Sequence, residues 1–413
     1  MNNKVIIIGS GFSSLSSACY LSKRGYQVEV FEKNESLGGR ARQFKKDGFT
    51  FDMGPSWYWM PDIFERFFND FDKSPSDYYK LKRLDPAYEV YFGTNEKIII
   101  DGNLDKIINV FEKEEKGSGE KLKRFIENAK VNYDIAINKI VYRPGKSPLE
   151  LITFETVKKI NLFLQNIKDE VYKNFKNPKL RQLLQFPVLF LGAKPKNTPA
   201  FYNFMNFADY GLGTWHPEGG IYSVIKAMVE LAESLGVKFN LNSPVEKIIV
   251  NESKANGIIV NKNFFEADVI LSGADYHHTE TLLSKELRAY SENYWSKKTF
   301  APSSLLFYIG LNKKIKNLAH HTLFFDVDFD KHAAEIYDDP KWPEEPLFYV
   351  NFPSKSDTTM SPPGKEACFI LIPLAPGLND TEKLRKKYLD LIIKRLEQRT
   401  EQEIGKHILF KKS

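Results

Sequence analysis

The chain has 413 residues, 42% of them hydrophobic and 27% charged, which is typical of a globular protein with about two domains. Its formal net charge of +6 is spread over mixed Lys and Glu stretches, and this excludes a concentrated nucleic-acid-binding surface. No apolar run approaches the roughly 18 residues of a membrane-spanning helix, so we expect any membrane contact to be peripheral or monotopic. Two cysteines in a chain of this length predict a reducing, cytoplasmic location rather than a disulfide scaffold.

The N-terminal residues predict a βαβ unit. Residues 4–9 form an apolar run typical of a buried strand, 12–24 a helix that ends at Gly25, and 27–32 a second strand. Two strands joined by a helix within about 30 residues are the signature of a parallel sheet.

The remaining elements alternate between sheet-like and helical patterns, and no internal repeat is found. We predict helices over 61–70, 119–142, 178–192 (interrupted by Pro187), 221–236 and 383–400. We predict strands over 87–93, 96–102, 237–242, 245–250, 255–260 and 300–312, with a buried strand inside 266–275.

The first glycine turn has the pattern of a dinucleotide-binding site. Gly9 allows a tight turn after the strand, and Gly11 lets the backbone approach a pyrophosphate at the N-terminus of the following helix. Ser14 occupies the third position, where glycine is usual and a small residue is needed. Glu32 ends the second strand, where a carboxylate can accept the ribose hydroxyls, and an acid at that position disfavours NADP.

A second glycine turn follows the acid. Gly38 and Gly39 allow another close backbone approach, and Arg40, with Arg42 behind it, can form forked hydrogen bonds to phosphate. A second phosphate-directed turn directly after the ribose acid favours FAD over NAD.

These segments resemble a known family. GSGFSSLSSACYLSKRGYQVEVFEKNESLGGRA, FTFDMGPSWYWMPDIFERFF, GTWHPEGGIYSVIKAMVELAESLGV and EADVILSGADYHHTE are similar to the bacterial phytoene desaturases, within the FAD-dependent amine oxidase superfamily. The resemblance implies an α/β fold, with a Rossmann-type FAD-binding domain (GR2-like) and an interleaved α+β substrate domain. It places the FAD-binding domain at 1–72 and 214–285, and the substrate or membrane-facing domain at 73–213 and 286–413.

The resemblance also implies site residues. The FAD-binding positions are Gly9, Gly11, Ser14, Glu32, Gly39, Arg40, Arg42, Gly54, Pro55, Ser56 and Val245. For the substrate, the resemblance implies Gly219 and Gly220, and Trp57, Trp59 and Phe186 are added as aromatic candidates for contact with an apolar substrate. The family's C-terminal glycine-rich segment, which completes the flavin site, does not occur within the 413 residues, so we expect a partial sequence or a variant without that region.

The implied activity is desaturation of phytoene to lycopene or to a partly desaturated intermediate. A hydrocarbon substrate offers no polar handle, so shape and apolar contact must orient it, and an aromatic tunnel is expected from Trp57, Trp59, Phe186, Phe190, Phe201, Phe204 and Phe207. The flavin would accept a hydride, a membrane quinone or oxygen would reoxidise it, and the enzyme would lie at the inner face of the cell membrane. No catalytic triad or metal cluster is found, and the proton acceptor stays unassigned.

Three alternatives remain open. The chain could be a carotenoid isomerase, a later-step carotenoid desaturase or oxidase, or a saturase of the same superfamily. It could instead be an inactive lipid-binding remnant, which flavin content would reveal. Adjacent histidines, at 277–278 and 320–321, would point to opposite faces of an extended segment and so suit metal chelation poorly.

Overall fold

The computed structural model describes residues 3–93, 96–189 and 191–413, which fold as two compact units. Unit 1 consists of Met1–Ser56, Asp62–Leu81 and Pro217–Thr299. Unit 2 consists of Trp57–Pro61, Lys82–His216 and Phe300–Ser413. The domain boundaries expected from the sequence stay a prediction. Strands β5 (Leu81–Arg83) and β8 (Trp215–Pro217) lie where the chain passes from one unit to the other.

Unit 1 is centred on a parallel sheet with strand order β13-β1-β2-β9. Strand β1 (Lys4–Ile8), helix α1 (Phe12–Lys23) and strand β2 (Gln27–Phe31) confirm the predicted βαβ unit. The helix ends as expected, because Gly25 adopts a φ of +87° and its N–H donates to the carbonyl of Ser22.

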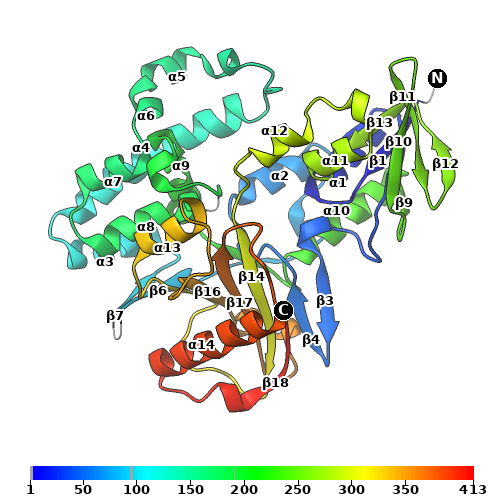
Figure 1. The fold of residues 1–413 in the computed structure, drawn as a ribbon. Helices are drawn as coiled ribbons and strands as arrows, with labels where there is room; N and C mark the ends of the chain where they lie inside the picture. The colour runs from blue at the N-terminus through cyan, green and yellow to red at the C-terminus, as the bar shows by residue number, and fades with distance from the viewer. Residues whose placement is uncertain (1–2, 94–95, 190) are drawn as a thin grey trace. The chain divides into compact units, whose positions relative to one another are not determined.

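The parallel sheet has a different partner on each face (Figure 1). Helices α1 and α10 (Tyr222–Ser234) pack against each other, and α1 also contacts β1 and β2. On the other face, Ile6, Ile8 and Phe31 pack against an antiparallel sheet made of β10, β11 and β12. This alternation follows from side chains pointing to opposite faces along each strand. The bounds of the other unit 1 elements are β3 (Gln43–Lys46), β4 (Phe49–Asp52), α2 (Pro61–Asn69), η2 (Pro75–Asp77), β9 (Lys238–Asn240), β10 (Val245–Asn251), β11 (Lys254–Val260), β12 (Asn263–Glu266), β13 (Val269–Ser272), α11 (Tyr276–Thr281), η8 (Lys285–Leu287) and α12 (Glu292–Ser296).

Two details of the prediction are wrong. Strand β13 is not buried, because it is the outer strand of the sheet and Val269 remains 45% exposed. Helix α8 (Pro178–Leu189) is not interrupted at Pro187, because the proline lies in the last turn, where only two further residues must remain helical.

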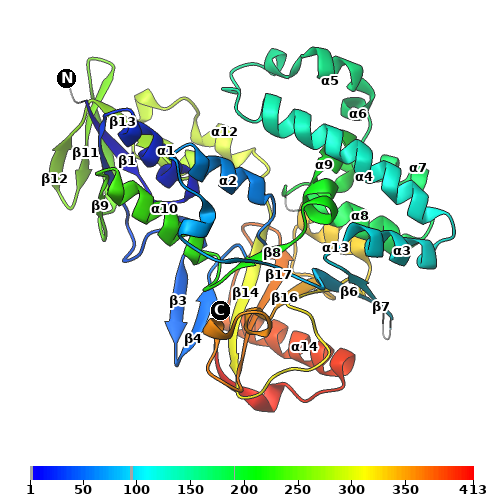
Figure 2. The same ribbon diagram turned by 180° about the vertical axis from the view of Figure 1, so that it is seen from behind.

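Unit 2 contains a sheet with strand order β18-β14-β17-β16-β15-β6-β7. Helix α14 (Glu382–Thr400) covers one face, where Tyr388, Ile392 and Leu396 join a core with residues of β14, β16 and β17. Helices α3 to α9 gather on the side of the sheet opposite α14 (Figures 1 and 2). The bounds of the other unit 2 elements are β6 (Tyr88–Phe92), β7 (Glu96–Ile100), α3 (Leu104–Glu114), α4 (Ser118–Ile135), η3 (Ala136–Ile140), η4 (Pro148–Leu151), α5 (Phe154–Lys158), α6 (Ile160–Leu164), α7 (Ile167–Asn174), η5 (Pro195–Asn197), η6 (Ala200–Asn203), α9 (Phe204–Asn206), η7 (Phe207–Gly211), β14 (Ser303–Leu311), β15 (His321–Phe324), α13 (Phe329–Tyr337), β16 (Phe348–Asn351), η9 (Pro353–Lys355), η10 (Thr358–Met360), β17 (Glu366–Leu374), η11 (Gly405–His407) and β18 (Ile408–Lys412).

The packing of α1 explains how serine is accommodated at residue 14. Ser14 is fully buried, and a methyl group added at Gly273, directly after β13, would overlap its hydroxyl. The glycine that the fingerprint lacks on the helix is thus present on the facing segment, where it gives Ser14 room.

We predict that Gly273→Ala destabilises the protein by about 1–3 kcal/mol, because the added methyl group overpacks the contact with Ser14. Ser14→Gly alone should cost less than about 1 kcal/mol, the usual penalty of a helical glycine. In the double variant the overlap disappears, so the two effects should not add. Urea unfolding of the four proteins measures this coupling, and strictly additive changes would contradict the proposed contact.

Candidate cofactor site and buried polar groups

Ser10 joins the three predicted parts of the cofactor site. Its N–H and hydroxyl both donate to Oε2 of Glu32, at 3.1 and 2.5 Å, and its hydroxyl oxygen accepts the N–H of Gly38 at 3.1 Å. Asn34 donates to the other Glu32 oxygen through both its backbone and its side chain. Glu32 is only 3% exposed, so these donors hold a buried carboxylate in one orientation. The sequence pattern missed Ser10 because it occupies the variable position between Gly9 and Gly11.

The glycine-rich segments pack directly on one another. A methyl group on Gly39 would lie 3.2 Å from Cα of Gly11, and one on Gly54 would overlap the carbonyl oxygen of Arg40. The N–H of Met53 donates to the carbonyl of Arg42 at 2.7 Å. These close approaches bring the first turn, the second turn and the loop after β4 into one backbone-lined surface.

The two arginines of the second turn differ in their exposure to solvent. Arg40 is exposed in η1 (Gly39–Ala41). Arg42 is half-buried, and its Nε donates to the carbonyl of Gly39 at 2.9 Å, so it braces the turn. Pro55 is exposed and Ser56 half-buried in the loop after β4.

Val245 begins β10, directly after the segment that lies beside Glu32. The N–H of Ser243 donates to the backbone carbonyl of Glu32 at 2.8 Å, and that of Asn242 donates to the carbonyl of Asn34. The structure therefore brings the predicted ribose acid and the backbone before Val245 together, although they are separated by more than two hundred residues.

Gly219 and Gly220 lie in unit 1, beside the end of β4. The carboxylate of Asp52 accepts the N–H groups of Ile221 and Tyr222 at the start of α10, at 2.7 and 3.2 Å, and a methyl group on Gly220 would overlap this carboxylate. Gln43 donates to the carbonyl of Gly219 at 2.9 Å. Both glycines also adopt a positive φ, +86° and +87°, which explains glycine at these positions, whereas their assignment to substrate binding stays a prediction.

The residues of unit 1 fit an FAD molecule. Within the part of the chain that the structure describes, no side chain caps the N-terminus of α1, and no acidic residue occupies its first turn. A methyl group on Gly11 would enter open space, whereas one on Gly39 would not. Gly11 and the first turn of α1 would therefore hold the pyrophosphate, Glu32 the ribose, and the backbone near Val245 the adenine.

The predicted aromatic substrate residues form two clusters within unit 2. Trp57 contacts Trp59 and Phe186, with ring centroids 5.4 and 5.7 Å apart, and Trp59 donates to the hydroxyl of Thr214. Phe201, Phe204 and Phe207 instead pack around α4, η6 and α9. Phe190 lies outside the described residues.

Three histidines are buried together in unit 2: the predicted pair His320 and His321, and His216, which the sequence analysis did not single out. His321 stacks on Trp57 with centroids 4.0 Å apart, and His320 lies 4.4 Å from His321 and 4.8 Å from His216. His216 shares a 3.0 Å hydrogen bond with Asp357. The expectation that adjacent histidines lie on opposite faces is thus wrong for this pair, because His320 precedes β15. The other pair, His277 and His278, lies on helix α11.

Burial shifts the pKa of several side chains in unit 2. Desolvation, followed by the charge of His216, lowers the pKa of His321 well below the usual value, and desolvation does the same for His320. Desolvation also lowers the pKa of His332 to about 4. Asp209 behaves oppositely, because burial raises its pKa to about 8 while the hydroxyl of Tyr88 donates to it at 2.7 Å. At neutral pH His320, His321 and His332 are therefore neutral, and Asp209 is largely protonated.

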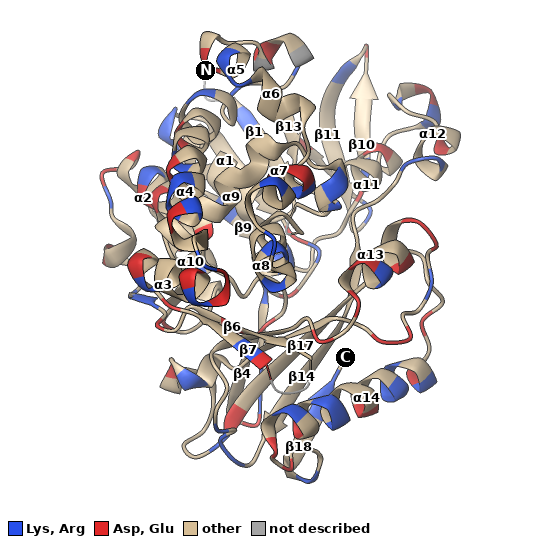
Figure 3. Cartoon of the chain, turned by 90° about the vertical axis from the view of Figure 1, so that its left-hand side faces the viewer, with Lys and Arg blue, Asp and Glu red and all other residues tan. Residues whose placement is uncertain are grey.

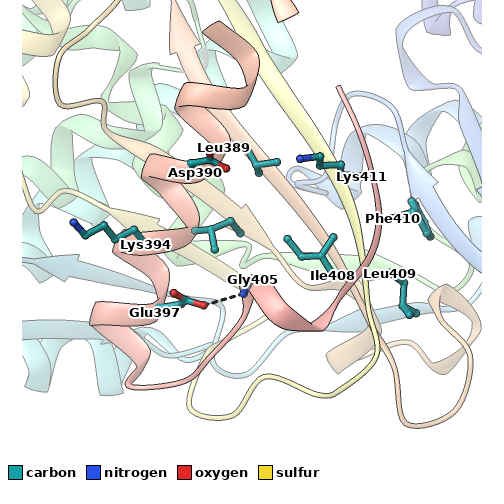
Figure 4. A pocket seen from close by; sticks show the side chains of 10 residues that line it. Leu389, Asp390, Lys394, Glu397, Gly405, Ile408, Leu409, Phe410 and Lys411 are labelled. Atoms are coloured by element: carbon teal, nitrogen blue, oxygen red, sulfur yellow. Dashed lines mark hydrogen bonds between the residues drawn. The ribbon is translucent and has the colours of Figure 1, made fainter. Parts of the chain in front are cut away.

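A separate hollow of about 500 Å³ lies between α14 and β18 (Figure 4). Its lining mixes apolar side chains with Asp390, Lys394 and Glu397, and Glu397 accepts the N–H of Gly405 at 2.8 Å. None of the predicted site residues belongs to this lining. Among the residues that the structure describes, no group of three or more His, Cys, Asp or Glu side chains could hold a metal ion.

We predict a stability maximum for unit 2 near pH 6.5. Below that value the unfolded chain binds protons at His320, His321 and His332 that the folded chain excludes, so the free energy of unfolding falls as the pH drops. Above it the folded chain retains a proton on Asp209 that the unfolded chain has lost, so stability falls by about 2 kcal/mol up to about pH 8.

Urea unfolding at several pH values measures this profile. Asp209→Asn should abolish the fall above pH 6.5, because an amide does not ionise, whereas Asp330→Asn, at an exposed site on α13, should leave it unchanged. A fall that persists in Asp209→Asn would contradict a protonated Asp209.

Comparison with known proteins agrees with this geometry. Residues 12–396 match the family model described as flavin containing amine oxidoreductase. An oxidoreductase from Methanosarcina mazei shares the fold, with a TM-score of 0.65 at 18% identity over 99% of this chain and 87% of that one.

Curated relatives place the chain more narrowly. It is 39% identical to the carotenoid 3,4-desaturase of Haloarcula japonica over 412 residues, which cover 99% of this chain and 83% of the relative. It is 29% identical to the zeta-carotene-forming phytoene desaturase of Myxococcus xanthus, over 90% of this chain and 72% of the relative. The chain belongs to the flavin-containing amine oxidoreductases and, among them, to the FAD-dependent carotenoid desaturases.

Proposed function

We propose that the chain introduces a double bond into a carotenoid, with the 3,4 bond as the first candidate and phytoene as the second. The observation that carries this order is the 39% identity to the 3,4-desaturase, against 29% to the phytoene desaturase. The resemblance to phytoene desaturases implied phytoene, with a later-step desaturase left open, and the difference in identity now favours the later step.

The aromatic cluster of unit 2 supports an apolar substrate. Trp57 and Phe186 contact one another, and both contact Tyr88. The side-chain hydroxyl of Tyr88 donates to Asp209. We expect a polyene to bind against such aromatic rings through apolar contact, which requires no polar group on the polyene.

Within this proposal, bound FAD supplies the acceptor for the hydride that leaves one carbon of the substrate. The chain's contribution is positional. Ser10 and Asn34 orient the Glu32 carboxylate toward the ribose, while Gly11, Gly39 and Gly54 let the backbone approach the dinucleotide. The adjacent carbon would lose a proton to a base, and a quinone or oxygen would serve as the final electron acceptor.

A peripheral location at the inner face of the cell membrane accords with such a substrate, because carotenoids dissolve in the bilayer. In the part of the chain that the structure describes, no helix combines the length and apolar character needed to cross a bilayer. The substrate would then enter from the lipid phase while the chain stays on the membrane surface.

Expression in two carotenoid-producing hosts tests the order of substrates. In cells that accumulate lycopene, we predict that the absorbance bands of the extracted pigment shift to longer wavelength, because a new double bond extends the conjugated system. In cells that accumulate colourless phytoene, we predict little coloured product.

The opposite pattern, with colour formed from phytoene and unchanged lycopene, would reverse the order. Unchanged absorbance in both hosts, despite bound flavin in the purified protein, would contradict desaturation. Conversion of one geometric isomer into another would instead identify an isomerase, and a shift to shorter wavelength a saturase.

A further inference from the structure

One segment of unit 2 exposes many large apolar side chains. From the end of η3 to the end of α6 the chain forms η4, α5 and α6, and we name this stretch, residues 139–164, the docking segment. Among the side chains of the segment that the structure describes, eight apolar ones are more than half exposed, from 51% for Ile160 to 79% for Leu164. They are Val141, Tyr142, Leu149, Ile152, Phe154, Val157, Ile160 and Leu164. Single exposed apolar residues are ordinary, but so many within one short segment indicate an interaction surface.

The docking segment has an ordered inner face. Ile140, Leu162 and Phe163 pack against the buried cluster of Ile135, Ala136 and Phe201, and the rings of Phe163 and Phe201 stack with centroids 4.6 Å apart. The exposed side chains therefore belong to the outer face of a folded, amphipathic element rather than to a loose loop.

Local hydrogen bonds also define the backbone of the segment. Thr153 caps α5, since its hydroxyl accepts the N–H of Thr156 at 3.1 Å while Thr156 accepts the N–H of Thr153 at 2.8 Å. The carboxylate of Glu150 accepts the N–H groups of Gly145 and Lys146, at 2.8 and 2.9 Å. The outer face is thus presented in a set conformation.

The charges of the segment favour an anionic partner. It carries five basic residues and two acidic ones, which Figure 3 shows in part along α5. Both acids are engaged within the segment, because Glu155 pairs with Lys139 and Glu150 accepts the two backbone N–H groups. Lys158 lies over the ring of Phe154, 3.9 Å from its centroid, so cation and apolar group occupy one surface.

We propose that the docking segment is a monotopic membrane-binding surface, whose apolar side chains enter an anionic bilayer while Lys146 and Lys158 contact lipid phosphates. Interleaved apolar and basic groups fit the boundary between acyl chains and anionic headgroups. A second copy of the chain is a poorer partner, because it would bring two positively charged segments together. The inference rests on the peripheral location proposed above, but not on the identity of the substrate.

Flotation on a density gradient, with vesicles of equal parts phosphatidylglycerol and phosphatidylcholine, tests this surface. The wild-type chain should float. Phe154→Ser with Leu164→Ser should lower the partition coefficient by about tenfold or more for each substitution, because each removes a large apolar group that lipid would bury. Both residues are highly exposed, so the fold should persist, which circular dichroism verifies.

A matched control replaces two other exposed apolar residues of unit 2. Leu409→Ser with Ile99→Ser changes side chains that are 48% and 41% exposed on β18 and β7, and this variant should float as the wild type does. Lys146→Gln with Lys158→Gln should weaken flotation with anionic vesicles, and added salt should weaken it in the wild type.

Three outcomes would overturn the proposal: a wild-type chain that does not float, a Phe154→Ser/Leu164→Ser variant that floats as well as wild type, or a control that loses flotation equally. Light scattering that finds a wild-type dimer, made monomeric by Phe154→Ser/Leu164→Ser, would assign the surface to a second copy if flotation also fails. Flotation lost in this variant alone supports the surface even where no carotenoid is converted, so failure of the proposed function is distinguishable.

Discussion

The buried contact among Ser10, Glu32 and Gly38 is the constraint on which unit 1 depends. One hydroxyl donates to a buried carboxylate and accepts the N–H of a glycine turn, so it ties the loop after β1 to the end of β2 and to the segment that follows. A carboxylate buried to this extent is costly unless it is hydrogen-bonded, and here four donor groups from Ser10 and Asn34 serve it. The arrangement sets the acid before any ligand arrives, which is the condition for selective ribose binding.

Several glycines of unit 1 allow neighbouring backbone segments to pack closely against one another. Gly39 packs on Gly11, Gly54 on the carbonyl of Arg40, and Gly220 on Asp52, so backbone meets backbone or carboxylate where any side chain would intrude. Gly273 extends the same principle to Ser14. In unit 2, by contrast, aromatic rings and buried polar groups, rather than glycines, form contacts between the sheet and its helices.

The sequence predicted the parts of the site that depend on local order. The run of strand, glycine turn, helix, strand and acid is short-range; its βαβ unit is confirmed, and its spacing singled out Gly9, Gly11 and Glu32 as candidates. The sequence did not predict a role for Ser10, because that role comes from side-chain contacts with residues 22 and 28 positions away. Gly273 and Asp52 were not predicted either, because their contacts join segments far apart in the chain and a local sequence pattern does not reveal such contacts. The histidine prediction failed for a related reason, since it assumed that His320 belongs to an extended strand.

Equilibrium titration with FAD, followed by flavin fluorescence, tests the central contact most directly. We predict that Ser10→Ala raises the dissociation constant by about tenfold or more, because Glu32 loses its orienting hydroxyl and the N–H of Gly38 keeps only the backbone carbonyl of residue 10 as an acceptor. Ser22→Ala is the matched control, since it removes a serine hydrogen bond to the carbonyl of Leu235 elsewhere in unit 1 and should leave FAD affinity unchanged. Equal affinities for wild type, Ser10→Ala and Ser22→Ala would contradict the account.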